Sequence, residues 1–81
     1  MATSTHKSSD NLYQMSNDFA KEIIKKIKEY NLTFSKYCAL INVNKYYLRK
    51  VMDRKIQMAC HLSFLEKIAE RTNISGIKLF K

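Results

Sequence analysis

The sequence predicts an all-α domain built from five helices. Its 81 residues include no Pro and one Gly, whereas a β-sandwich or barrel of this size normally shows many turn residues. Hydrophobic residues make up 46% of the chain, which is enough for one small core without a disulfide or metal to support it. These residues also recur at helical spacing along most of the sequence, as expected for amphipathic helices.

The chain divides into a short tail and one domain. Residues 1–9 are polar and rich in Ser and Thr, and we expect them to be disordered. Residues 10–81 are expected to form a single domain. The apolar runs are too short to span a membrane, and the first residues do not resemble a signal peptide. We therefore expect a soluble, cytoplasmic protein.

The first helix is expected over residues 17–30, where apolar residues recur at helical spacing and Lys residues occupy the opposite face. The apolar stripe consists of Phe19, Ile23, Ile27 and Tyr30. An earlier start remains open, because Leu12 and Met15 extend this stripe. Ser9 and Asp10 both have side chains that can cap such an earlier helix.

Residues 33–52 predict two short helices joined by a tight turn. Thr33 can cap the second helix of the domain, because its side-chain oxygen can accept a free backbone N–H. That helix is expected to end at Ile41, and Asn42 suits the left-handed conformation that commonly closes a helix. Asn44 can then cap the third helix, so the segment is expected to form a helix-turn-helix.

Apolar residues give each of these two helices an inward face and place one apolar residue in the turn. The inward set is Tyr37, Cys38, Ile41, Val43, Leu48 and Val51. The outward face of the third helix carries Lys45, Tyr46, Arg49 and Lys50. A narrow helix with cations and hydrogen-bonding groups on its exposed face is what the major groove of DNA admits.

Two further helices are expected after a connector over residues 53–62. Ser63 and Glu66 form a capping box, which predicts that the fourth helix starts after Ser63. Asn73 is a second candidate for the left-handed position that ends a helix. Ser75 can cap a final short helix. This helix would carry Ile77, Leu79 and Phe80.

The charge of the chain points to a polyanionic partner. The net charge is +8 and the isoelectric point is about 9.7. From Lys45 to Lys55 the sequence has five basic residues and one acid, whereas an ordinary exposed face mixes the two signs more evenly. Nucleic acid is the first candidate partner and an anionic membrane surface the second.

The order of the expected helices resembles the Cro/lambda-repressor-like family of DNA-binding domains, also called the XRE family. Cys38 matches the family's small residue in the second helix, and residues 65–75 resemble its fourth helix and exit. Asn42 stands where the family usually has a turn glycine, a change that the left-handed conformation tolerates. The resemblance covers residues 19–80. It implies a five-helix domain that binds DNA through its second and third helices.

The resemblance also implies which residues touch DNA. Base or groove contacts are expected from Lys45, Tyr46, Arg49 and Lys50. Phosphate contacts are expected at the start of the second helix, at the start of the third, and in the connector, because helix N-termini and cations both attract phosphate. These residues are Phe34, Ser35, Lys36, Asn44, Arg54 and Lys55.

The family usually binds as two-fold dimers on half-sites about one helical turn apart. The last expected helix is the surface for such a homodimer, which either exists free or forms only on DNA. Its interface residues would be Ile77, Leu79 and Phe80.

The sequence does not predict an enzyme, and it implies no cofactor. It lacks a nucleophile elbow, a phosphate-binding Gly loop and a carboxylate constellation. Cys38 and Cys60 form no CxxC motif, and with His6 and His61 they lack the spacing of a zinc site. The sequence does not exclude a disulfide between Cys38 and Cys60, although we expect both thiols to be reduced.

The function that we expect is a sequence-specific regulator of transcription that binds double-stranded DNA, most simply a phage or bacterial repressor. Two alternatives share the fold. One is the DNA-binding antitoxin of a toxin–antitoxin pair, which would also bind a small toxin. The other is a module that engages only another protein, which would show no affinity for DNA and no dependence on salt.

Overall fold

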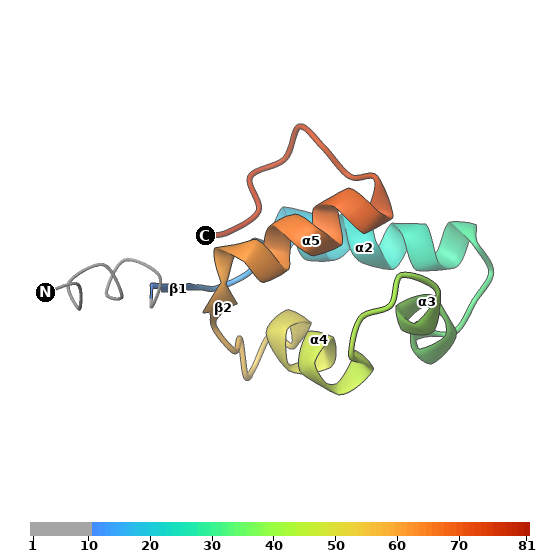
Figure 1. Cartoon of the computed structure of the whole chain (residues 1–81), viewed down its shortest axis with the longest axis horizontal. Coiled ribbons are helices and arrows are strands. Elements are labelled where there is room, and N and C mark those ends of the chain that lie inside the picture. The colour runs from blue at the N-terminus through green and yellow to red at the C-terminus, as the bar shows by residue number, and fades with distance from the viewer. Residues whose placement is uncertain (1–10) are drawn as a thin grey trace, which may run out of the picture.

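The computed structural model describes residues 11–81, which contain four helices and one two-stranded antiparallel sheet (Figure 1). The elements follow in the order β1 (Leu12–Tyr13), α2 (Asn17–Glu29), α3 (Phe34–Leu40), α4 (Lys45–Met52), β2 (Cys60–His61) and α5 (Leu62–Thr72). The expected tail over residues 1–9 lies outside the described residues. Within the described part, none of the helices has the length and apolar character needed to cross a bilayer.

The prediction of an all-α, five-helix domain is wrong, because the last segment is not helical. Residues 74–81 instead return from the end of α5 to the start of α2 (Figure 1). There the N–H of Ser16 donates to the carbonyl of Leu79 at 3.0 Å, and Met15 forms an antiparallel bridge with Phe80. So short a segment makes a marginal helix on its own, and this pairing satisfies its backbone groups by another route.

The two strands are also a departure from the all-α prediction. Leu12 pairs with His61 and Tyr13 with Cys60, so the residues before α2 are tied to the residues before α5. The idea that the first helix starts earlier, at Ser9 or Asp10, is therefore wrong. α2 begins at Asn17 and is capped by Ser16, whose hydroxyl accepts the N–H of Phe19 at 3.0 Å.

The start of α5 was also predicted incorrectly. The helix begins at Leu62, so Ser63 lies within its first turn and the capping box does not set the boundary. His61 occupies the N-cap position but makes no side-chain capping bond. His61 is held in the sheet by its pairing with Leu12. β2 therefore continues directly into α5, with no connecting residue between them.

Both caps predicted for the helix-turn-helix are present. The Thr33 hydroxyl accepts the N–H of Lys36 at 3.2 Å and starts α3. The Asn44 side-chain oxygen accepts the N–H groups of Tyr46 at 2.9 Å and Tyr47 at 3.0 Å and starts α4. The observed ends of both helices therefore lie within one residue of the predicted ends.

Three helices end in the same way, on an Asn in the left-handed conformation. The φ angles are 56° at Asn31, 58° at Asn42 and 59° at Asn73. The N–H of the residue after each Asn reaches back to a carbonyl five positions earlier, as when Val43 donates to Cys38 at 2.9 Å, and this is the Schellman pattern. The sequence predicted Asn42 and Asn73 but not Asn31.

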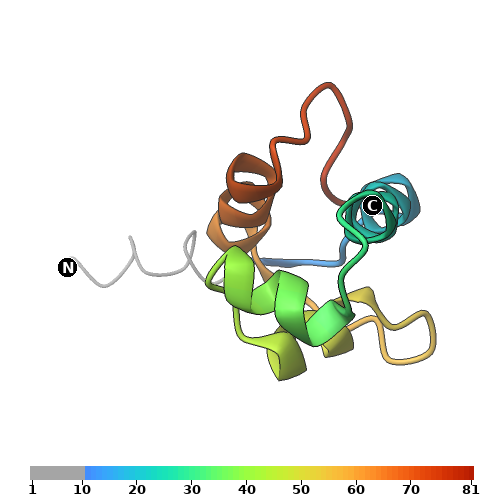
Figure 2. The same cartoon turned by 90° about the vertical axis from the view of Figure 1, so that its right-hand side faces the viewer.

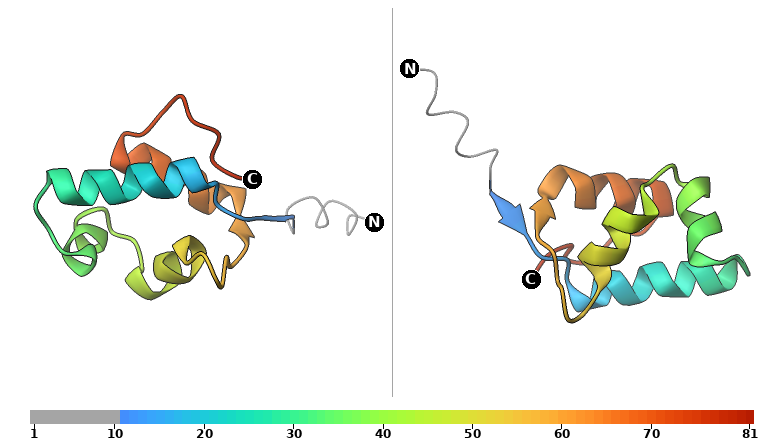
Figure 3. Two further views of the ribbon diagram at one scale, coloured as in Figure 1. Left: turned by 180° about the vertical axis from the view of Figure 1, so that it is seen from behind. Right: turned by 90° about the horizontal axis from the view of Figure 1, so that it is seen from below.

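The core lies where all four helices meet. Seen from below in Figure 3, α4 lies between α2 and α5, and α3 lies at the end of the molecule where α2 ends; Figure 2 shows α3 and α4 together on one side of the other two helices. The largest fully buried side chains are Tyr37, Phe19, Ile23, Leu48, Leu65, Ile68, Cys38 and Cys60. Both thiols are free, and burial raises the pKa of each.

Candidate nucleic-acid interface

α4 has one face in the core and one in solvent. Leu48 is 0% exposed and Val51 is also buried, so the opposite face must point outward. Tyr46 is 68% exposed, Arg49 and Lys50 are exposed, and Lys45 is partly exposed. The structure thus brings the four predicted groove-contacting residues to one open face.

The turn before α4 sets the angle between the two helices of the motif. Asn42 takes the left-handed conformation there, and Val43 is buried beside it. The Val43 side chain anchors the turn in the core, as the apolar pattern predicted. α3 and α4 are therefore held together by a short, well-packed connection rather than by a loose loop.

Arg71 on α5 also holds this turn, and sequence reasoning missed it. Its Nη1 donates to the carbonyl of Ile41 at 2.9 Å and to that of Asn42 at 3.0 Å. These carbonyls lie at the C-terminal end of α3, where a cation is favoured. The only sequence signal was a basic residue in the last turn of α5, which is ordinarily attributed to that helix's own dipole.

Replacing Arg71 by Met is expected to lower the free energy of unfolding by about 1 kcal/mol. Two hydrogen bonds from a charged donor are lost, and the value stays small because the side chain is largely exposed. Denaturation in urea measures the change. Lys67→Met on the same helix is the control and should have a smaller effect. Equal unfolding midpoints for wild-type protein and Arg71→Met would contradict this role.

The first turn of α3 orients two cations of α4. The ammonium group of Lys45 donates to the hydroxyl of Ser35 at 3.2 Å. The guanidinium of Arg49 lies 4.9 Å from the centre of the Phe34 ring, within cation–π range. Phe34 and Ser35, predicted as phosphate contacts, therefore also position two of the side chains that are predicted to contact the groove.

The remaining phosphate candidates lie on α3, at the start of α4 and in the turn after α4. Lys36 is exposed on α3 and Asn44 is exposed at the start of α4. The oxygen of Asn44 is used for capping, which leaves its amide group as a donor. Arg54 and Lys55 are exposed on the turn that follows α4.

The turn over residues 53–57 is organised by Asp53. One of its carboxylate oxygens accepts the N–H of Lys55 at 2.7 Å and that of Ile56 at 3.0 Å. These hydrogen bonds from Ile56 and Lys55, with the nearby charge of Lys55, hold the pKa of Asp53 below its usual range. The carboxylate of Asp53, the one acid between Lys45 and Lys55, thus accepts hydrogen bonds from the backbone of its own turn.

The turn should loosen in acid because of this carboxylate. A pKa that is lower in the folded than in the unfolded state adds stability at neutral pH, and that stability is lost as the pH falls through the folded pKa. We expect the backbone amide signals of Lys55 and Ile56 to shift together in that acidic range when followed by NMR. Amide signals that do not titrate together would contradict this account of the turn.

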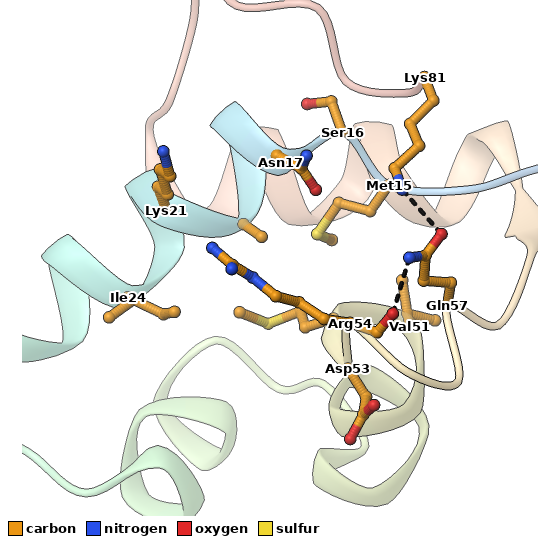
Figure 4. Close-up of a pocket in the computed structure, with 12 residues that line it drawn as sticks. Met15, Ser16, Asn17, Lys21, Ile24, Val51, Asp53, Arg54, Gln57 and Lys81 are labelled. Carbon is orange, nitrogen blue, oxygen red and sulfur yellow. Dashed lines mark hydrogen bonds between the residues drawn. The ribbon is translucent and has the colours of Figure 1, made fainter.

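A pocket of about 140 Å³ separates this turn from the start of α2 (Figure 4). In Figure 4 the Arg54 side chain extends along the pocket toward the part of α2 that carries Lys21 and Ile24, while Asp53 points away. Gln57 lies at one end, where its side chain accepts a hydrogen bond from the Lys81 ammonium at 2.7 Å and donates one to the Arg54 carbonyl at 2.7 Å. The last residue of the chain therefore supports the turn after α4.

The predicted dimer residues lie in a different setting from the one expected. Ile77, Leu79 and Phe80 belong to the extended last segment and are partly buried against the protein's own core. The Phe80 ring packs on Tyr13 with ring centres 4.7 Å apart. The predicted helical dimer surface is therefore absent from residues 74–81. A dimer formed through this segment would have to use the parts of Ile77, Leu79 and Phe80 that remain exposed to solvent.

The exposed face of α4 carries cations and an aromatic ring. Within residues 11–81, no three His, Cys, Asp or Glu side chains gather where they could hold a metal ion. The ammonium group of Lys45 lies 5.1 Å from the centre of the Tyr46 ring, and Tyr46 is the most exposed of the large hydrophobic residues in the described part. Comparison of the chain with protein-family models, with curated proteins and with solved structures found no match.

Proposed function

We propose that this protein is a sequence-specific regulator of transcription that binds double-stranded DNA with α4 in the major groove. The observation that carries the proposal is the two-sided character of α4. Leu48 is fully buried on one side, and the residues on the other side are three cations and Tyr46. The tight turn before α4 and the resemblance to the Cro/lambda-repressor-like family support the same reading.

The chemistry of this face suits base edges. The Arg49 guanidinium can form paired hydrogen bonds with guanine O6 and N7, and Lys45 or Lys50 can reach the same acceptors. Tyr46 can pack on a thymine methyl group or donate to a phosphate. Phe34 and Ser35 already hold Arg49 and Lys45, which lowers the entropy lost when these side chains bind.

Regulation follows from where such a protein would bind. A protein on a promoter excludes polymerase, so repression in the cytoplasm of a phage-infected or bacterial cell is the simplest outcome. A homodimer on two half-sites about one helical turn apart would place one α4 in each of two successive major grooves. The dimer is part of the proposal, whether it exists free or forms only on DNA.

Selection of bound duplexes from random-sequence DNA tests the proposal. The wild-type chain should enrich a common sequence, whereas Lys45→Ala and Lys50→Ala should each lose or change that preference, because each good base contact discriminates by about 1–3 kcal/mol. Lys25→Ala, which removes an exposed cation from α2, is the matched control and should select the wild-type sequence. Unchanged selection by both α4 variants would refute the role of α4, and no enrichment at low salt would refute DNA binding.

A further inference from the structure

We propose that the turn over residues 53–57 is a second DNA-binding element, in which Ile56 packs against the deoxyribose edge of the minor groove beside the major groove that α4 occupies. This inference rests on the proposed function of α4. It adds a contact that the basic residues alone do not imply, namely an apolar one outside the major groove.

Ile56 is presented to solvent by a basic turn. Its side chain is 58% exposed, and both preceding residues, Arg54 and Lys55, are exposed cations. A single exposed Ile needs no explanation on most surfaces. Here its flanking charges favour a polyanion, and the turn continues directly from the C-terminal end of α4.

The turn is held rigidly at both of its ends. Asp53 accepts the N–H of Ile56, and its carbonyl accepts the N–H of Gln57 at 2.7 Å. The carbonyl of Gln57 accepts a hydrogen bond from the side-chain amide of Gln14 at 3.0 Å. The N–H of Met58 donates to the backbone carbonyl of Lys50 in α4 at 3.1 Å. Little conformational freedom is left to lose when Ile56 meets a partner, which favours binding.

The size of α4 fixes what the turn can reach. α4 has eight residues and is therefore about 12 Å long. With the N-terminal residues of such a helix on the base edges, its other end lies about 12 Å away, and we place the turn that follows against the phosphate strand at the wall of the groove. Lys55 is then placed for a phosphate, whereas Arg54 would have to turn out of the pocket beside α2 to reach one. The minor groove lies on the far side of that strand.

The chemistry of the minor groove fits the tip of the turn. Its walls are the C–H edges of deoxyribose, and proteins that bind this groove frequently insert apolar side chains such as Phe, Leu or Ile into it. An Ile side chain has no polar group that would lose water without a partner. The lining thus accepts the side chain on both steric and solvation grounds.

The experiment compares Ile56→Ala with Leu40→Ala on the duplex recovered by selection. Leu40 is 59% exposed and lies on α3, so it matches Ile56 in exposure but not in position. Ile56→Ala should bind about tenfold more weakly, and Leu40→Ala should bind like wild type. Hydroxyl-radical footprinting should show that wild type protects deoxyriboses next to the major-groove segment and that Ile56→Ala loses this flanking protection alone.

The outcomes separate the two proposals. Suppose that wild type binds the duplex and protects guanine N7 from methylation, but the flanking deoxyriboses stay reactive toward hydroxyl radicals. The proposal for the turn then fails, while the role of α4 stands. Equal affinities for Ile56→Ala and wild type would also overturn it. If no duplex is recovered or bound at low salt, both proposals fail together. Thermal unfolding of Ile56→Ala should match wild type, because the side chain makes little contact with the core.

Discussion

Raising the salt concentration from about 50 to about 200 mM is expected to lower the affinity of this protein for duplex DNA about 500-fold per protomer. The expectation follows from the five cations of α4 and of the turn after it, each of which displaces about one of the counterions condensed on the DNA. Five such contacts give a slope of about −4.5 in a plot of log affinity against log salt. Fluorescence anisotropy with a labelled duplex, repeated over a salt series, measures the slope.

Single substitutions test which cations contribute to that slope. Lys55→Ala should make it shallower by about 0.9, because this side chain is exposed beside the proposed phosphate strand. Lys25→Ala should leave the slope as it is. A wild-type slope near zero would show that charge plays no part in binding. No binding to the duplex at any salt concentration would favour the alternative of a module that engages only another protein.

Replacing Leu48 by Ala is expected to lower the free energy of unfolding by about 3 kcal/mol. Leu48 is fully buried in the core beneath the exposed face of α4. Its loss removes apolar contacts and leaves a cavity that neighbouring side chains fill only in part. Since small domains are stable by only about 5–15 kcal/mol, this one change removes a large share of the total.

Urea denaturation followed by circular dichroism measures this effect. Leu40→Ala is the control, because the same atoms are removed from a side chain in solvent, and its cost should stay below about 1 kcal/mol. If Leu48→Ala and Leu40→Ala lost similar stability, α4 would not be anchored through Leu48. The assignment of the opposite face to DNA would then lose its structural basis.

The helix-turn-helix could be predicted because its boundaries are set by neighbouring residues. Thr33 and Asn44 cap helices through bonds that span two or three positions. Asn42 ends a helix because its own backbone tolerates a positive φ. Such signals are complete within a few residues, so they can be interpreted without knowledge of the rest of the fold.

The two ends of the domain could not be predicted in this way. The pairing of Leu12 with His61 and of Met15 with Phe80 joins segments that are far apart in the sequence. Ser75 could cap a helix, but the segment that follows it pairs with residues 15–16 instead, and no local pattern in the sequence predicts that pairing. The start of α5 was misplaced for the same reason, because the strand that contains His61 replaces the expected cap.

The candidate site was predicted in part. Helical spacing alone separates Leu48 from Tyr46 and Arg49, so the composition of the exposed face could be read from the sequence. The supports of that face come from other elements. Arg71 reaches the turn from α5, and Phe34 reaches Arg49 from α3; such contacts depend on tertiary packing, which a spacing pattern does not contain.

The junction between Ser16 and the last segment has a consequence for the order of folding. The Ser16 hydroxyl donates to the carbonyl of Lys78, 62 positions away, whereas the contacts between α3 and α4 close only short loops. Long loops cost more entropy to close, so local contacts form faster. On the ribosome the helix-turn-helix can therefore assemble before the pairing of Met15 with Phe80 forms, because that pairing requires residues 78–80 to have been synthesised.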